Sequence, residues 1–263
     1  MIRLDYVGGM SSIAAAALDP KAHVDYLVEN TSRSFRRHAL GHPFMQELAE
    51  GHLAIEQIRG FVLNWYTWTF EINMATATWL YRFGSILKAC PDIAEILHQK
   101  IADELITPTT RGHMETLETL GTALGLTREA LIQARLIPEA RAWLDYFVRL
   151  VLEGTFAECV AGYLGEGCFP EFAKIFEHAL TTHYGLSQQD VEYFRIHGEQ
   201  DAIHGPGNAF ILRRLIETGH HEERSGWGLE YVSSTGGQLF VSFLDGVYRR
   251  YKPEAVAAGQ RPS

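Results

Sequence analysis

Apolar side chains recur at helical spacing through almost the whole chain. In residues 21–38, Val24, Leu27, Val28 and Phe35 are separated by three, four and seven positions, which places them on one face of a helix. Residues 54–87 are apolar and aromatic-rich on every side, which predicts a central buried helix. No segment shows the alternation of a half-buried strand, so the pattern predicts an all-α protein.

Proline and glycine residues set the predicted helix boundaries. The chain breaks at residues 41–43, 107–112, 125 and 154–155. We expect further helices over residues 44–49, 91–106, 113–124, 130–134, 138–153, 156–167, from 170 onward, 187–217 and 222–251. The last of these is either a pair of helices or one helix kinked at residues 236–237. No linker divides the chain, so we expect an N-terminal extension (1–20), one helical domain (21–253) and a frayed tail (254–263).

Composition narrows the class of protein. The 263 residues are 46% hydrophobic and can bury a sizeable core. The 23 Lys and Arg against 32 Asp and Glu give a net charge of −9, which repels phosphate backbones and anionic lipids, so we expect no nucleic-acid or membrane partner. Three cysteines favour a reducing compartment over a disulfide framework. No signal peptide or membrane span is predicted, and the expected location is cytoplasmic.

The sharpest chemical signal is His197-x3-Asp201-x2-His204. At about 100° per residue, the three side chains project from one face of a helix within two turns. Imidazole nitrogen and carboxylate oxygen at this spacing suit Fe, Mn or Zn. The alternative is a polar, solvated helix face.

Other carboxylates and one imidazole stand in unusual surroundings. Glu166 lies in a segment of small and apolar residues, where a buried carboxylate would need a partner. The alternative is that it is hydrated at a helix end. Tyr163 lies on the same helix face as Glu166. Glu104 and His113 flank the break at 107–112 and can share a metal only if the helix opens there. Glu71, among aromatic residues of the central helix, is a further buried-carboxylate candidate, as a ligand, a substrate contact or the partner of an arginine.

Together the helical segments supply three carboxylates and three imidazoles, the number that a two-metal site inside a helical bundle requires. Such a mixed set of nitrogen and oxygen ligands favours iron or manganese over structural zinc, which usually recruits cysteine. The six predicted ligands are Glu104, His113, Glu166, His197, Asp201 and His204.

Several segments resemble the haem-oxygenase-like superfamily, which includes thiaminase II, pyrroloquinoline-quinone synthase and haem-oxygenase-like diiron oxidases. The resemblance lies in residues 41–44, 50–53, 57–61, 121–129 and 193–194, and covers residues 35–215. The overall pattern is most similar to the quinone synthase, a cofactorless oxidase. The candidate ligands instead match the diiron members, in order: a Glu and a later His, a Glu before Pro170, and His-x3-Asp-x2-His.

The resemblance implies a single bundle of seven to eight helices whose metal-binding helix is labile, here at Pro108 and Gly112. It also implies a non-haem diiron oxygenase or oxidase that uses two Fe(II) ions, or Mn, with O2 as co-substrate and a reductant where one is required. The substrate class is a small metabolite bearing an amine, an amino acid or a carboxylate. It would be N-oxygenated, desaturated or cleaved at a C–C bond in a biosynthetic pathway. A homodimer is left open.

Four residues are candidates for the substrate pocket or for contacts behind the ligands: Glu71, Tyr163, Tyr193 and Arg111. Aromatic residues of the central segment, Trp65, Trp68, Phe70 and Trp79, are candidates for either pocket or core.

Three other functions stay open. A thiaminase-II-like hydrolase would use Cys159 as nucleophile, four residues before Tyr163, as that family does. The others are a cofactorless quinone-synthase-like oxidase and a non-enzymatic regulator.

Overall fold

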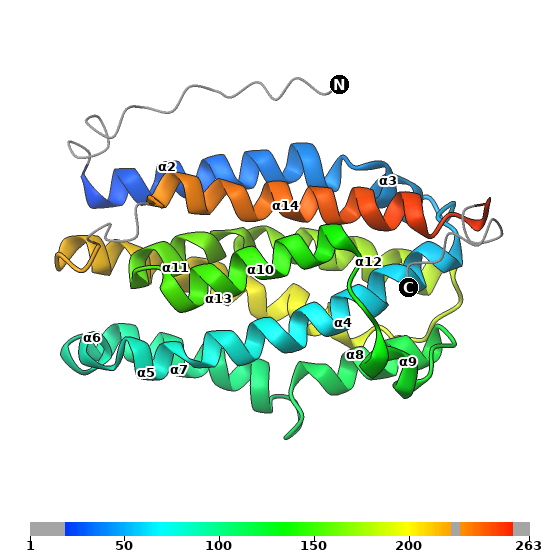
Figure 1. Ribbon diagram of the computed structural model, residues 1–263, viewed down its shortest axis with the longest axis horizontal. Helices are drawn as coiled ribbons and strands as arrows, with labels where there is room; N and C mark the ends of the chain where they lie inside the picture. Colours follow the sequence, from blue (N-terminus) through cyan, green and yellow to red (C-terminus); the bar gives the residue numbers. More distant parts are fainter. Residues whose placement is uncertain (1–18, 222–226, 255–263) are drawn as a thin grey trace.

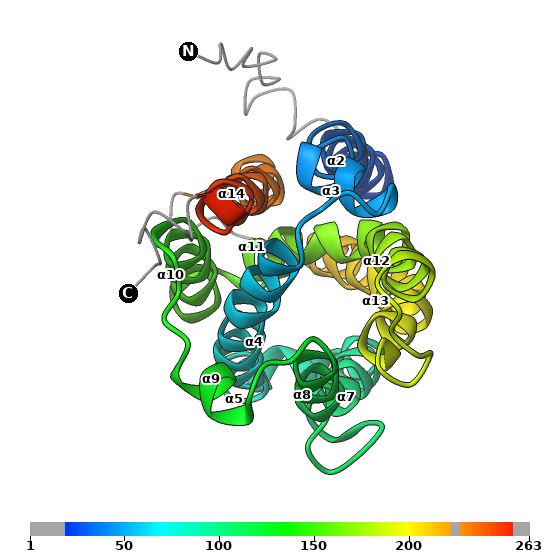
Figure 2. The ribbon, with the colours of Figure 1, turned by 90° about the vertical axis from the view of Figure 1, so that its right-hand side faces the viewer.

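A computed structural model describes residues 19–221 and 227–254. Within them there is no strand, and eight helices of at least eleven residues form the bundle (Figures 1 and 2). These are α2 (Pro20–Phe35), α4 (Ile55–Ala77), α7 (Pro91–Ile106), α8 (His113–Ala123), α10 (Pro138–Glu153), α12 (Phe169–His183), α13 (Glu192–Glu217) and α14 (Leu229–Arg250). The predicted all-α bundle of seven to eight helices is confirmed.

Short helices connect the long ones. They are the π-helix η1 (Arg36–Leu40), α3 (Pro43–Ala49), α5 (Trp79–Arg82), α6 (Gly84–Ala89), α9 (Arg128–Gln133), α11 (Phe156–Gly162) and the 3-10 helix η2 (Tyr163–Cys168). Proline stands at the first turn of α2, α3, α7, α10 and α12, where its missing N–H costs no hydrogen bond.

Two predicted helices were wrong in extent. The segment 54–87 is not one helix, because α4 ends at Ala77 and two short helices follow. The Thr78 hydroxyl donates to the Ala75 carbonyl at 2.6 Å, a local bond that competes with the helical ladder. The helix predicted from residue 187 begins at Glu192, because the Asp190 carboxylate accepts from the Ser187 backbone N–H at 2.8 Å and holds a turn there.

Some predicted boundaries fall outside the described residues. Helix α14 begins at Leu229 and is continuous through residues 236–237, whereas the predicted start at residue 222 lies in the part that is not described. Nearly all of the N-terminal extension and of the tail also lies outside. The three-part division of the chain therefore stays a prediction.

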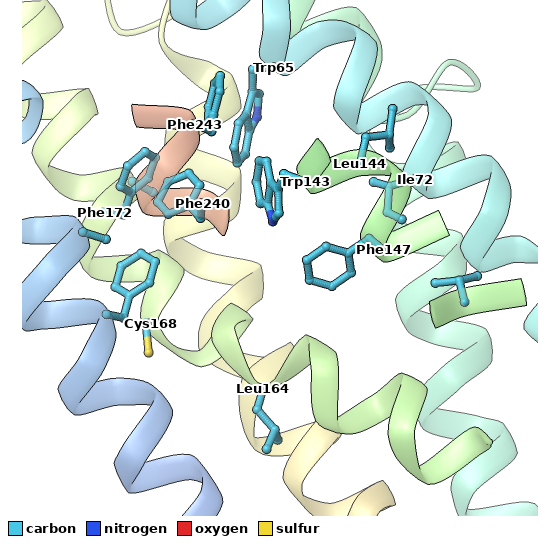
Figure 3. Packing of buried hydrophobic residues seen from close by; sticks show 14 of the residues in the cluster. Trp65, Ile72, Trp143, Leu144, Phe147, Leu164, Cys168, Phe172, Phe240 and Phe243 are labelled. Atoms are coloured by element: carbon cyan, nitrogen blue, oxygen red, sulfur yellow. The ribbon is translucent and has the colours of Figure 1, made fainter. Parts of the chain in front are cut away.

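Aromatic side chains fill the centre of the bundle (Figure 3). Trp68 stacks on Trp143 with ring centroids 4.0 Å apart, and Trp65 stacks on Trp68 at 5.4 Å. Trp79 packs against Phe83, Phe156 and Tyr163. Three of the four aromatic candidates therefore belong to the packed interior. The fourth, Phe70, is 50% exposed, so its assignment to pocket or core was wrong.

The arrangement of helices brings distant segments together. Helices α7 and α8 lie between α4 and α13 and contact both (Figure 2). The 3-10 helix η2 packs on α13. Helix α14 lies against α2, α10 and α11 on the other side of the bundle (Figure 1). In the described residues, no helix is long and apolar enough to cross a membrane.

Candidate metal centre

Helix α13 carries three of the candidate ligands on one face. His197 is 6% exposed, Asp201 3% and His204 6%, so the face points into the bundle rather than into solvent. Phe194 and Ile211 of the same helix are buried in the core, which fixes the rotation of α13. The three side chains that were predicted to share one helix face therefore form a buried polar stripe. Buried polar groups need hydrogen-bond, ionic or metal partners.

The break between α7 and α8 brings Glu104 and His113 together. Thr107 is extended, as expected before a proline, and ends α7. Gly112 has φ of 59°, and a Cβ at this position would lie 2.3 Å from the Glu104 carbonyl oxygen. Only glycine permits this close return of the chain. His113 Nδ1 then lies 3.1 Å from Glu104 Oε2, because the helix opens between them.

The 3-10 helix η2 delivers Glu166 to the same region. Gly167 lies against α13 at Gly205, so closely that a Cβ on Gly205 would be 2.4 Å from the Gly167 Cα. Two glycines facing each other thus permit the backbones to approach. The Glu166 side chain, 24% exposed, reaches the His204 end of the α13 stripe.

The six side chains form two clusters. Glu104, His113 and His197 are the Glu104 cluster, and Glu166, Asp201 and His204 are the Glu166 cluster. In each cluster, one ligand atom from every residue lies within 4.8 Å of the others. The clusters are neighbours, since the charge of Glu104 raises the pKa of Asp201 and the charge of Asp201 raises the pKa of His113. Each offers nitrogen and oxygen donors in numbers that suit Fe or Mn.

In each of the three histidines, the chain holds one ring nitrogen and leaves the other available. His197 Nδ1 donates to the Tyr193 carbonyl at 2.8 Å. His113 Nδ1 faces Glu104, and His204 Nε2 lies 3.2 Å from Asp103 Oδ2. The remaining nitrogen of His113 is buried and has no hydrogen-bond partner among the described residues, and that of His204 faces Asp201 Oδ1 at 3.3 Å. An acceptor behind the ring is the usual arrangement for metal-binding histidines, and His197 and His204 show it, so these residues fit a metal.

Burial and neighbouring charge set the protonation of the clusters. Burial lowers the pKa of His197 to about 4, so that it is a neutral imidazole at pH 7. Burial disfavours the charged form of His204 as well, but hydrogen bonding to Asp201 outweighs it and raises the pKa to about 9. Burial opposes ionisation of Glu104 too, yet the hydrogen bond from His113 holds its pKa below the usual range. A metal would therefore displace a proton on binding.

Both predicted tyrosines lie behind the clusters. The Tyr193 ring is 4.1 Å from the His197 ring, and its hydroxyl accepts from Trp65 Nε1 at 2.6 Å. The Tyr163 hydroxyl is 2.6 Å from the hydroxyl of Thr76 on α4. Burial raises the pKa of each phenol, so both stay protonated at neutral pH.

Two other predicted residues are not brought to the site. Glu71 is not buried: its side chain is 41% exposed and lies 3.8 Å from Arg141. Glu71 lies on the outer face of α4. The aromatic residues around it in the sequence had suggested that it was buried. Arg111 is exposed and pairs with Glu118 at 2.5 Å on the surface of the α7–α8 break.

Sequence reasoning missed four polar residues that support the clusters. Asn73 donates to Glu104 Oε2 at 3.2 Å, and Asp103 accepts from His204. Lys100 and Asn208 both bind Glu166 Oε2. Helical spacing contained a signal, because Lys100 precedes Glu104 by four residues and Asn208 follows His204 by four, which puts each pair on one face.

The thiaminase-II-like hydrolase alternative depends on Cys159, which is fully buried. Its thiol lies 3.2 Å from the Leu150 carbonyl, and burial raises its pKa to about 12. Neither property suits a nucleophile, which needs a thiolate and access to substrate.

Comparison with known proteins shows which proteins the chain is similar to. A profile of the TENA/THI-4/PQQC family matches residues 31–193. The pyrroloquinoline-quinone synthase of Pseudomonas aeruginosa is 27% identical over 200 residues, which are 73% of this chain and 76% of that protein. The 4-aminobenzoate synthase of Nitrosomonas europaea is 24% identical over 244 residues, 88% of this chain and 92% of that protein.

Solved structures show the same fold. A domain of unknown function with a haem-oxygenase-like fold from Shewanella denitrificans OS217 superposes with a TM-score of 0.66 at 16% identity, covering 94% of this chain and 99% of that one. A TenA homologue from Pseudomonas syringae pv. tomato gives 0.65 at 15% identity, covering 89% and 94%. At such identities the similarity establishes the haem-oxygenase-like fold alone.

Proposed function

We propose, from the premise that this chain belongs to the TENA/THI-4/PQQC family, that it is a non-haem diiron oxygenase or oxidase of a biosynthetic pathway. The relatives just described are named as synthases, so the family supports an enzyme of small-molecule biosynthesis. The choice of a metal-dependent oxidoreductase rests on the two clusters. The observation that carries it is the arrangement of the three histidines, each with one nitrogen held by the chain and the other available.

The residues of the chain would hold and orient the metal pair. Asn73 and His113 fix one oxygen of Glu104, and the Tyr193 carbonyl fixes the tautomer of His197, so that its Nε2 is the unprotonated nitrogen. Asp103 does the same for His204, with Nδ1 as the available atom. When bound, a ferrous pair would supply the electrons that reduce dioxygen. The packed aromatic residues behind Tyr193 exclude water from that side of the site.

The substrate class is a small metabolite that bears an amine, an amino acid or a carboxylate. The name of the Nitrosomonas relative supports it, because 4-aminobenzoate carries both an amine and a carboxylate. N-oxygenation, desaturation and oxidative C–C cleavage are the outcomes we propose. Substrate and O2 are the proposed partners, with a reductant where the outcome consumes electrons.

A cofactorless oxidase is the second candidate. The similarity to pyrroloquinoline-quinone synthases favours it. A cofactorless oxidase, however, would have no need for six buried or half-buried side chains of metal-ligating types in two clusters.

The two candidates are separated by replacing one ligand. In His204→Ala, binding of the second iron and iron-dependent O2 uptake should both be lost, while His178→Ala, an exposed histidine of α12, should retain them. O2 uptake that persists in His204→Ala and in the presence of a chelator would favour the cofactorless oxidase.

A further inference from the structure

A buried lysine lies against one of the two clusters. Lys100 of α7 is 4% exposed, and its Nζ donates to Glu166 Oε2 and, at 3.1 Å, to Asn208 Oδ1. The ammonium also lies 4.8 Å from the centre of the Tyr163 ring. A lysine is seldom buried without a partner, so these contacts account for its position.

Lys100 and Asn208 together occupy one oxygen of Glu166. Asn208 Nδ2 donates to the same Oε2 at 2.8 Å, so this atom accepts from an ammonium and from an amide at once. The ammonium is close enough to Asp201 and His204 to influence the pKa of each. A divalent cation held by the Glu166 cluster would therefore meet a fixed positive charge at short range in a poorly screened interior.

The Glu104 cluster differs in this respect. Among the described residues, Glu104 forms an ion pair with His113 and with no lysine or arginine. Its other donor is the neutral amide of Asn73. An imidazolium loses its charge when a metal displaces its proton, whereas the ammonium of Lys100 keeps its charge.

We propose that Lys100 is an internal counter-cation of the Glu166 cluster, which makes this cluster the weaker of the two metal positions, so that a divalent cation fills the Glu104 cluster first. The inference rests on the proposed function, because it takes both clusters to be metal positions. Lys100 is thus a positioning residue. Without metal, Lys100 neutralises Glu166, whose largely buried carboxylate would destabilise the fold if it were unpaired. Once the first metal is bound, the charge of Lys100 opposes binding of the second.

Titration with Mn(II) alone tests this proposal, because the electron paramagnetic resonance signal of hydrated Mn(II) measures the free ion directly. The full-length protein should bind two Mn(II) in two steps whose dissociation constants differ by at least about tenfold. Lys100→Gln keeps hydrogen-bond donors but removes the charge, and it should tighten the second step at least about tenfold while the first is unchanged.

Matched variants separate charge from packing. Lys100→Arg keeps the charge and should retain two separated steps, and so should Lys88→Gln, an exposed lysine of α6. Lys100→Met, without charge or donors, should tighten the second step as Lys100→Gln does, and either variant suffices if the other fails to fold. A second step that is unchanged or weakened in the neutral variants would overturn the role of Lys100 and leave the proposed function standing. Failure of the unaltered protein to bind any Mn(II) or Fe(II) would overturn both.

Discussion

Asp103 Oδ2 lies 3.2 Å from His204 Nε2, on the side of the ring opposite the atom that faces Asp201. The pair joins α7 to α13 and leaves His204 Nδ1 as the available nitrogen. Because a carboxylate behind a ligand histidine orients the ring and raises its basicity, Asp103 should contribute to metal affinity without touching the metal.

Asp103→Asn should weaken metal binding by about 10- to 100-fold, since the amide neither carries charge nor fixes the same tautomer. Competition against a chromophoric chelator would measure the affinity. Glu95→Gln, an exposed carboxylate of the same helix, is the control and should bind metal normally. Equal affinity in both variants would exclude a role for Asp103 behind His204.

The reactivity of Cys159 tests the hydrolase alternative. With its pKa raised to about 12 by burial, the thiol should be alkylated by iodoacetamide roughly 1000-fold more slowly at pH 8 than in the denatured chain. The rate in the denatured chain should level off above about pH 9, whereas in the native protein it should keep rising. Mass spectrometry of the Cys159 peptide provides the rates. Equal rates, or loss of turnover in Cys159→Ala alone, would support the nucleophile.

The hydrogen bond from Trp65 to Tyr193 connects the aromatic core to the Glu104 cluster. Tyr193→Phe leaves the buried Trp65 Nε1 without its acceptor and should lower the free energy of unfolding by about 1–3 kcal/mol. Urea denaturation measures the loss. As a control, Tyr81→Phe, at a side chain that is 93% exposed, should change the free energy of unfolding by less than about 0.5 kcal/mol. A Tyr193→Phe protein as stable as the control would contradict this contribution.

The contact between Gly205 and Gly167 should tolerate no side chain. Gly205→Ala places a Cβ 2.4 Å from the Gly167 Cα, so η2 must move and take Glu166 with it. We expect a loss of about 1–3 kcal/mol in unfolding free energy and weaker binding of the second metal.

Gly237→Ala in α14 is the matched control. A Cβ there meets nothing within 4 Å, so alanine should stabilise the protein by about 0.5–1 kcal/mol. Thermal unfolding with and without Mn(II) compares the two variants. Unaltered stability and metal binding in Gly205→Ala would show that the close approach is dispensable.

The sequence was sufficient for most of the helices and for the identity of the six clustered side chains. The limits of α7 and α10 coincide with those predicted, because proline begins both and the residues after them cannot continue a helix. The α13 face could be read from spacing alone. The prediction that Glu104 and His113 lie together depended on the helix opening between them. Gly112, with its positive φ, permits that opening.

What the sequence concealed depends on packing between helices. Glu71 was taken as buried because its neighbours are aromatic, but the side of α4 that faces solvent is decided by α10 and α7, not by composition. Lys100 and Asp103 resemble the surface residues of any amphipathic helix until α13 and η2 are placed against them. A polar residue acquires a role only when its partner is known, and these partners lie 66 and 101 positions away.

Anaerobic reconstitution with Fe(II) tests the central claim most directly. Metal analysis after removal of unbound iron should give two Fe per chain, falling below one in His113→Ala, and brief exposure to O2 should produce a transient visible absorption. Fewer than one iron per chain in the unaltered protein, with full activity retained in chelator, would contradict the diiron assignment.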